Sequence, residues 1–203
     1  MARLSRRFFA RPTLAVARAL LGQRLVRIYR GRRLAGLIAE TEAYIGEDDL
    51  ACHARFGRTL RNGVMYGPPG HAYVYFTYGM HWMLNFVTEA EGFPAAVLIR
   101  AIFPVEGIEA MRRWRRRPDK ILADGPAKLA QAMDIDKRLD GCDLCAPDSA
   151  LFVERGRAAP EAEVIRGPRV GLNRTLEPWV SKPWNFRWQV SSKESAYSVF
   201  RIA

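Results

Sequence analysis

Apolar positions in the N-terminal part of the chain predict one helix followed by two strands. The stretch from Pro12 to Gly22 has proline where a helix begins and glycine where it ends, with an apolar run between them. Gln23–Arg30 and Leu34–Tyr44 then read as two strands joined around Gly31. The sequence therefore predicts a helix that leads directly into a β-hairpin.

A second hairpin is predicted after a long segment without periodicity. Ile45–Met65 has neither helical nor strand spacing and contains three glycines, so we expect a long functional loop there. His71–Thr77 and Met80–Thr88 read as the two arms of a hairpin that turns at Tyr78-Gly79. Ala95–Ile102 is a further apolar strand.

The C-terminal half combines two helices with several short strands. Glu106–Arg116 and Asp124–Gln131 are predicted helices, the second with proline near its start. Short strands are predicted at Leu151–Glu154, Glu163–Ile165, Asn185–Val190 and Tyr197–Phe200. Because strands outnumber helices and cluster, we expect an α+β fold, a single domain over residues 1–203. It would have a mixed, mostly antiparallel, curved sheet with flanking helices and a protruding β-hairpin.

Charge points to a polyanionic partner. The chain has 203 residues and a formal net charge of +11, and 27 of its 32 basic residues are arginine. Guanidinium groups bind phosphate oxygens well, so nucleic acid is the leading candidate for the partner. The alternative, that the arginines only reflect the codon composition of the genome, stays open.

The arginine-rich N-terminus could be mistaken for an organelle transit sequence. Its helix pattern, however, indicates that it is part of the fold. Three cysteines, no secretory signal and no membrane-length apolar run favour a cytoplasmic protein with no membrane partner. A DNA partner would make it nucleoid-associated.

A polar strand face stands out next to the predicted loop. Strand alternation puts Glu40, Glu42 and Tyr44 on one face. A carboxylate can activate water, and aromatic rings can hold a flat base by stacking. The ordinary structural interpretation, in which such a glutamate only pairs with Arg100, is the better one for each residue taken singly.

The second hairpin carries a cluster of tyrosines. Tyr73 and Tyr75 share one face of its first arm, whereas Tyr78 lies in the turn and should project outward. Further polar groups in apolar or glycine-containing surroundings are His53, Asn85 and Arg100.

Many short motifs along the chain together resemble one family. The matching pieces are Phe8-Phe9-Ala10-Arg11-Pro12, Ala17–Gly22, Glu40–Tyr44, Arg61-Asn62, Tyr73-Val74-Tyr75, Tyr78-Gly79-Met80, Asn85, Leu98–Ala101, Gly125–Leu129 and Arg169-Val170-Gly171. In this order and spacing they are similar to the alkyladenine (3-methyladenine) DNA glycosylases that are unrelated to the helix-hairpin-helix type. The resemblance implies a monofunctional enzyme that flips damaged purines out of duplex DNA and hydrolyses the N-glycosidic bond.

The resemblance implies catalytic roles for three residues. Glu42 would be the general base that activates water, and we expect it to face a cavity open to DNA rather than to lie sealed in the core. Arg100 and the backbone carbonyl of Val170 would help to hold that water. No lysine matches a nucleophile position, so simple hydrolysis without strand cleavage is expected.

The resemblance also implies how the base and the DNA are held. Tyr44, His53 and Tyr75 would form the stacking pocket, and Asn85 would reject the exocyclic amine of guanine. Residues implied to contact the duplex are Tyr78 as the wedge, Met80 and His81 as its support, and Lys128 at the phosphate backbone.

Two departures from the family pattern affect these expectations. The loop from His53 to Asn62 looks one residue shorter than in the mammalian members, which puts substrate range in doubt, and position 81 is histidine in place of an aromatic residue. Trp114 within the Arg112–Arg117 run has no clear counterpart; it could grip DNA or belong to a solvated helix face.

Other function classes fit the sequence less well. Cys142 and Cys145 could supply only two ligands, whereas a structural zinc site usually needs four. We therefore expect no metal and no cofactor. A zinc deaminase would need a glutamate two residues after His53, where the chain has arginine, and a serine hydrolase would need a nucleophile-elbow motif, which the sequence lacks.

The partner expected is double-stranded DNA with damaged purines, bound by a monomer. The alternative is a non-catalytic sensor of distorted nucleic acid.

Overall fold

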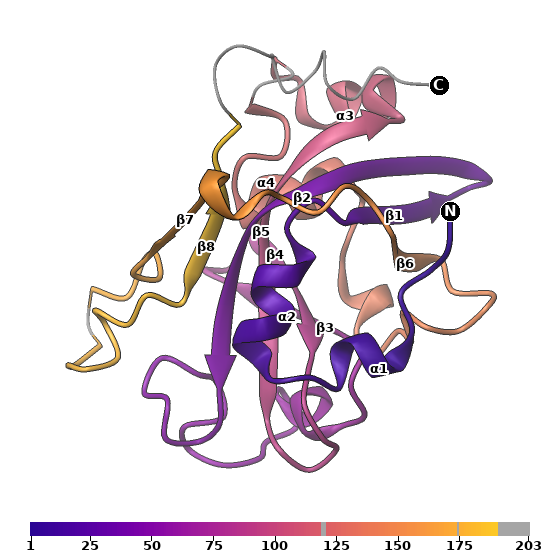
Figure 1. The fold of residues 1–203 in the computed structure, drawn as a ribbon. Coiled ribbons are helices and arrows are strands. Elements are labelled where there is room, and N and C mark those ends of the chain that lie inside the picture. The colour runs from indigo at the N-terminus through magenta and orange to yellow at the C-terminus, as the bar shows by residue number, and fades with distance from the viewer. Residues whose placement is uncertain (119–120, 174, 191–203) are drawn as a thin grey trace.

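The longest strand, β2 (Arg32–Ile45), forms the axis of the fold (Figure 1). The computed structural model describes residues 1–118, 121–173 and 175–190. Along one edge, β2 pairs with β1 (Arg24–Tyr29) and, further on, with β8 (Asn185–Trp188). Along its other edge it pairs with β5 (Ala95–Glu106). Both ends of β2 are therefore held by neighbouring strands.

The sheet continues outward on both sides of these strands. Beyond β5 lie β4 (His81–Val87) and then β3 (Ala72–Thr77), while β6 (Leu151–Glu154) pairs with β1 and β7 (Val164–Gly167) pairs with β8. Each pairing between described strands is antiparallel. The predicted α+β class is confirmed, and the strand predicted at Leu151–Glu154 has those bounds. The strand predicted at Tyr197–Phe200 lies outside the described residues.

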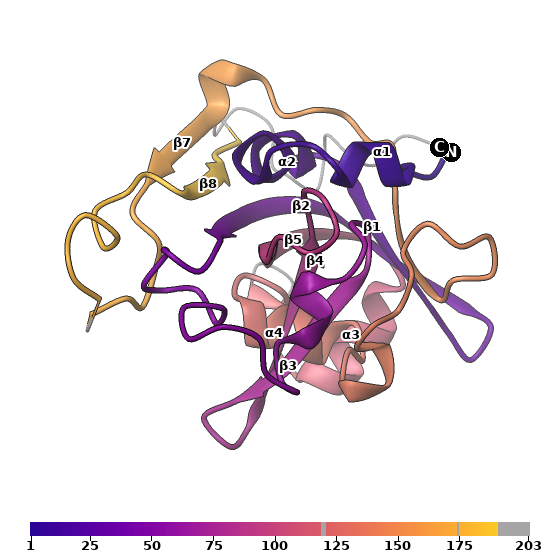
Figure 2. The ribbon, with the colours of Figure 1, turned by 90° about the horizontal axis from the view of Figure 1, so that it is seen from below.

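Helices cover both faces of the sheet (Figure 2). α2 (Thr13–Leu20) packs on β2 and β5, and α1 (Arg6–Phe9) precedes it. On the other face, α4 (Pro126–Ala132) packs on β4 and β5, beside α3 (Ile108–Arg115). The core between these layers includes the fully buried residues Val16, Leu20, Ile38, Phe86, Ile99 and Leu129. The described helices are too short and too polar to cross a membrane.

Three short 3-10 turns complete the described structure. They are Gly63–Tyr66 in the long loop after β2, Lys137–Leu139 after α4, and Glu161–Glu163 before β7. The loop predicted between Ile45 and Met65 is therefore not entirely irregular.

The glycine at the end of α2 is required by both its backbone and its neighbours. Gly22 has φ +83°, and a Cβ added to it would lie 1.9 Å from the carbonyl oxygen of Arg157. Only glycine fits this close approach, which ends the helix and turns the chain into β1.

The main difference from the sequence prediction lies at the end of β5. This strand continues to Glu106, beyond the Ile102 end predicted, because its last residues still pair with the start of β2. Gly107 then takes φ +70°, which ends the strand, and α3 begins at Ile108 instead of Glu106. The four-residue helix α1 was not predicted, since it is too short to show periodicity.

A bulge interrupts the pairing of β2 with β5. The register shifts twice between Ile38 and Thr41, with Ala39 and Arg100 as the extra residues on the two strands. Bulges bend a strand and redirect side chains. Here the bulge lies at Glu40 and brings Arg100 onto the polar face of β2.

The outer edge of β3 is covered by the segment that follows α4. The Ala72 N–H donates to the carbonyl oxygen of Cys142, and the Ala72 carbonyl accepts from the Gly141 N–H, both at 2.8 Å. The Val74 N–H donates to Asp140 Oδ1 at 2.9 Å. This segment therefore binds the main chain of β3 in place of another strand.

Candidate active site

A cavity of about 330 Å³ opens between the second hairpin, the long loop and the segment after β7. Its walls combine aromatic rings with a few polar groups, which is typical of a ligand site. The lining residues are Tyr44, Ala51, His53, Met65, Tyr73, Tyr75, Thr77, Tyr78, Met83, Asn85, Leu98, Arg100, Pro126, Val170, Gly171 and Leu172.

The Glu42 carboxylate lies directly behind this lining and accepts four hydrogen bonds. Oε1 accepts from the Val170 N–H at 2.7 Å and from Asn185 Nδ2 at 3.1 Å. Oε2 accepts from the Tyr44 hydroxyl at 2.9 Å and from Arg100 Nη1 at 3.3 Å. An ionised carboxyl group has about four acceptor positions, so the carboxylate is fully satisfied.

Glu42 is more enclosed than we expected from the sequence. Its side chain has 0% exposed surface and does not itself line the cavity. Three of its donors, Tyr44, Arg100 and Val170, do line it. The carboxylate is thus separated from the cavity only by the groups that hold it. The observed bond from Val170 uses its N–H, whereas the role predicted for its carbonyl stays a prediction.

The three predicted stacking residues line one cavity. His53 lies 4.4 Å from Tyr75 between ring centroids, in an edge-on arrangement, and its Nδ1 lies 2.9 Å from the Tyr73 hydroxyl. Tyr44 joins them from β2. Burial raises the pKa of Tyr75 to about 12 and raises that of Tyr44 well above its ordinary value, so both hydroxyls are neutral at pH 7. These residues form a neutral, aromatic wall.

His53 is also neutral at physiological pH. Burial, together with the positive charges of Arg61 and Arg55, lowers its pKa to about 4. Asn62 fixes the loop around it by donating from Nδ2 to the His53 carbonyl at 2.9 Å and to the Gly57 carbonyl at 3.0 Å.

Asn85 lies in the cavity wall on β4. Its Nδ2 donates to the main-chain carbonyl of Tyr73 at 3.0 Å, which fixes the amide plane. The structure therefore brings Asn85 to the predicted pocket; its predicted rejection of guanine stays a prediction.

The tip of the β3–β4 hairpin projects away from the rest of the chain (Figure 2). Tyr78 is 82% exposed, with φ +51°, and also touches the cavity. Met80 is exposed on the other side of the turn, next to His81. Phe76, Tyr78 and Met80 are all exposed large apolar residues at this tip, and such residues close together mark an interaction site.

A second groove begins at the hairpin tip and runs along α3 and α4. Met80, His81 and Lys128 all line it, so the structure brings the predicted duplex contacts together. Trp114 lines it too, and its ring packs edge-on against Tyr29 at 5.3 Å. The groove next to the exposed tyrosine therefore combines aromatic and basic side chains with the acidic Asp134 and Asp136.

Two interactions around the site were not predicted from the sequence. Asp49 and Arg169 form an ion pair with no exposed side-chain surface, and Asn185 donates to Glu42. Arg169 was noticed only as part of a motif, and Asn185 only as the first residue of a predicted strand. Asp49 lies in a loop without periodicity and gave no signal.

The cysteine pair is held by other groups. Cys142 Sγ lies 3.2 Å from the Ser149 hydroxyl, and Cys145 is partly buried against the core. Within the described part of the chain, three or more potential metal ligands do not come together anywhere.

Comparison with known proteins gives one consistent result. Residues 7–192 match the family model described as methylpurine-DNA glycosylase. A protein of Methanocella arvoryzae is 51% identical over 185 residues, covering 90% of each chain. A protein of Carboxydothermus hydrogenoformans is 49% identical, and the match covers 84% of this chain and 88% of that protein. A protein of Streptomyces avermitilis is also 49% identical, and the match covers 87% of this chain and 85% of that protein. All three carry the name "Putative 3-methyladenine DNA glycosylase".

Proposed function

The chain belongs to the methylpurine-DNA glycosylase family, a family of N-glycosyl hydrolases acting on DNA, and we propose that it excises damaged purines by a Glu42-activated water. The substrates would be 3-methyladenine, hypoxanthine and other alkylated or etheno purines in duplex DNA. The product would be an abasic site for base excision repair.

One observation carries this proposal. The Glu42 carboxylate is held by four donors immediately behind a cavity whose walls include Tyr44, His53 and Tyr75. A purine is flat, so aromatic walls suit it, and the cavity volume of about 330 Å³ is at the lower end of ligand-site sizes. The net charge of +11 supports a polyanionic substrate.

The chemistry requires only one carboxylate. As the bond between sugar and base breaks, positive charge builds on the sugar, and a nearby carboxylate stabilises it. Water then attacks the anomeric carbon, its proton passes to Glu42, and the bonding electrons leave with the base. A purine alkylated on a ring nitrogen already carries positive charge and leaves as a neutral base, whereas a neutral base such as hypoxanthine has to take up a proton from solvent as it leaves. Among the described residues, the cavity lining contains no lysine, in keeping with hydrolysis without a Schiff base.

Base flipping would use the hairpin tip. Tyr78 would occupy the space that the flipped nucleotide leaves, with Met80 and His81 beside it and Lys128 at the phosphates. The cavity and the groove meet at this tip, since Tyr78 lines the first and Met80 lines the second. Asn85, fixed through its Nδ2, would reject purines that carry the exocyclic amine of guanine.

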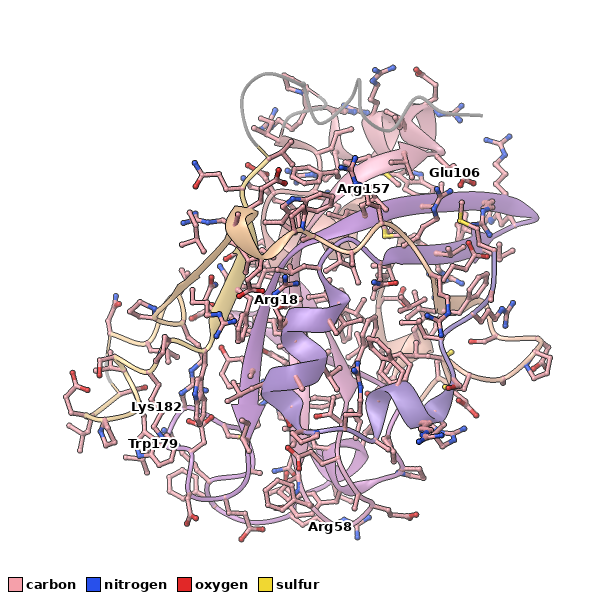
Figure 3. All side chains as sticks on the ribbon, in the orientation of Figure 1. Arg18, Arg58, Glu106, Arg157, Trp179 and Lys182 are labelled. Atoms are coloured by element: carbon pink, nitrogen blue, oxygen red, sulfur yellow. The ribbon has the colours of Figure 1, made fainter. Side chains whose placement is uncertain are left out.

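The decisive experiment combines a substrate panel with one variant. Wild-type protein should release alkylated, deaminated or etheno purines from duplex oligonucleotides. Glu42→Gln should abolish release and keep duplex binding. The matched control is Glu106→Gln, whose carboxylate binds Arg24 and Arg33 at the other end of β2 (Figure 3).

The same assay separates the rival functions. A non-catalytic sensor would bind distorted duplexes without releasing any base, and full activity of Glu42→Gln would remove Glu42 from the mechanism. Excision from an inosine-containing RNA in preference to the matched DNA would make RNA the substrate.

A further inference from the structure

Glu40 and Glu42 share two hydrogen-bond donors. Arg100 donates from Nε to Glu40 Oε1 at 2.8 Å and from Nη1 to Glu42 Oε2 at 3.3 Å. Asn185 Nδ2 lies 2.7 Å from Glu40 Oε1 and 3.1 Å from Glu42 Oε1. The four groups therefore close a ring, and both donors lie nearer to Glu40.

The other two donors of Glu42 are bound more tightly and only to it. The Val170 N–H lies at 2.7 Å and the Tyr44 hydroxyl at 2.9 Å. Since all acceptor positions of Glu42 are filled, a water molecule can bind the carboxylate only after one donor leaves. Arg100 and Asn185 are the donors with the longest bonds and with a second acceptor close by.

We propose that Glu40 is a positioning residue that draws Arg100 and Asn185 away from Glu42 and so opens one of its oxygen positions to the attacking water. This rests on the proposed function, in which Glu42 is the base. Glu40 itself does not line the cavity and would not touch the substrate. Its side chain is 15% exposed, whereas that of Glu42 is 0% exposed, so Glu40 is the less enclosed of the two carboxylates.

The charge balance of the ring explains why this role needs a carboxylate. Two carboxylates face one guanidinium, so Arg100 cannot neutralise both. Other groups facing the ring are Tyr44 on β2, Tyr75 on β3, Arg187 on β8 opposite Glu40, and Arg169, which is paired with Asp49. Without the Glu40 charge, Arg100 and Asn185 would bind Glu42 alone, and the carboxylate would stay both closed and stabilised in its ionised form.

Two variants should change the pH dependence in opposite directions. The measurement is the single-turnover rate of release from a duplex that holds one alkylated purine, followed against pH. For Glu40→Gln we expect a rate about ten- to a hundredfold lower, since the attacking water is misplaced, with the acidic limb of the profile moved to lower pH. Asn185→Asp replaces a donor with a third carboxylate, so its acidic limb should move to higher pH.

Affinity and stability measurements make these results specific. Binding of the lesion duplex by Glu40→Gln should stay within about twofold of wild type, because Glu40 lies behind the pocket wall. Glu106→Gln removes the carboxylate that binds Arg24 and Arg33, away from Glu42. This variant should leave the release rate and its pH profile unchanged. Thermal unfolding of each variant identifies one that fails to fold, in which case the other variant carries the test.

Several results would overturn the inference. A wild-type rate for Glu40→Gln, or a loss that is the same at every pH, would leave Glu40 with no positioning role. Shifts of both variants in the same direction would also contradict it. If Glu40→Gln is unaffected while Glu42→Gln is inactive, this inference alone fails; if Glu42→Gln is active, the proposed function itself fails.

Discussion

Arg169 and Asp49 form a two-pronged ion pair with bonds of 2.5 and 2.8 Å and no exposed side-chain surface. The same guanidinium donates to the main-chain carbonyls of Ala43 and Trp179 and lies 4.7 Å over the Tyr44 ring. One buried pair thus fixes β2, the loop after it and the segment that follows β7. Two walls of the cavity, the loop after β2 and the segment after β7, depend on this contact, and so does the position of Tyr44 on β2.

Breaking this ion pair should strongly destabilise the protein. Asp49→Asn leaves a buried guanidinium without its charge partner, which costs about 3–5 kcal/mol. Urea unfolding measures the loss. Asp124→Asn, which removes the exposed partner of Lys128, should cost less than about 1 kcal/mol. Comparable losses for the two variants would show that burial of the Arg169 pair has no energetic consequence.

Tyr78 should contribute to lesion binding and not to folding. Its backbone has φ +51°, a conformation that asparagine tolerates, so Tyr78→Asn removes the ring and keeps the turn. Affinity for lesion duplex should fall by a few kcal/mol at most, the scale of unstacking. The midpoint of thermal unfolding should not change. Unaltered lesion affinity would mean that Tyr78 is not the wedge.

Lys128 should contribute to the salt dependence of DNA binding. Its ion pair with Asp124 is exposed and therefore weak, which leaves the ammonium available to a phosphate. Lys128→Gln should weaken binding to all duplexes and reduce the slope of log K against log salt by about one. Arg18→Gln is the control, because Arg18 lies on α2, on the opposite face of the sheet from α4 (Figures 2 and 3). Equal slopes for Lys128→Gln and wild type would exclude a phosphate contact.

His53 should make the protein less stable in acid. Its pKa is lowered to about 4 in the folded state, below the usual value of 6.5. The unfolded chain therefore takes up this proton first, and the free energy of unfolding falls as the pH drops from about 6.5 towards 4. His53→Gln should lose this component of the pH dependence in urea unfolding. A titration of the His53 ring by NMR with a midpoint near 6.5 would contradict the expectation.

The sequence predicted those parts of the site that lie on regular strands. Alternation placed Glu42 and Tyr44 on one face of β2, and the hairpin pattern placed Tyr75 and Tyr78, because strand spacing fixes where side chains point. The bulge at Glu40 could not be read from the pattern, since one extra residue on each strand leaves no signature in the residues themselves. For that reason the bonds that Arg100 makes to both Glu40 and Glu42 were not predicted.

Contacts between loops that are far apart in the chain could also not be predicted from the sequence. Asp49 and Arg169 are 120 residues apart, and both lie in irregular segments that follow strands. Asn185 reaches Glu42 only because β8 pairs with β2 beside β1, a topology that short strand patterns do not determine. The enclosure of Glu42 follows from its donors Tyr44, Arg100, Val170 and Asn185, and the last two come from distant parts of the chain, so it became visible only in three dimensions.

The covered edge of β3 has a consequence for how copies of the protein meet one another. An outermost strand normally offers a row of free amides and carbonyls onto which an identical chain can add its own strand. Here Asp140, Gly141 and Cys142 already satisfy the first part of that row. At Ala72 and Val74 the main chain of β3 is therefore unavailable to an added strand, so a second copy of the chain cannot extend the sheet along that part of its edge.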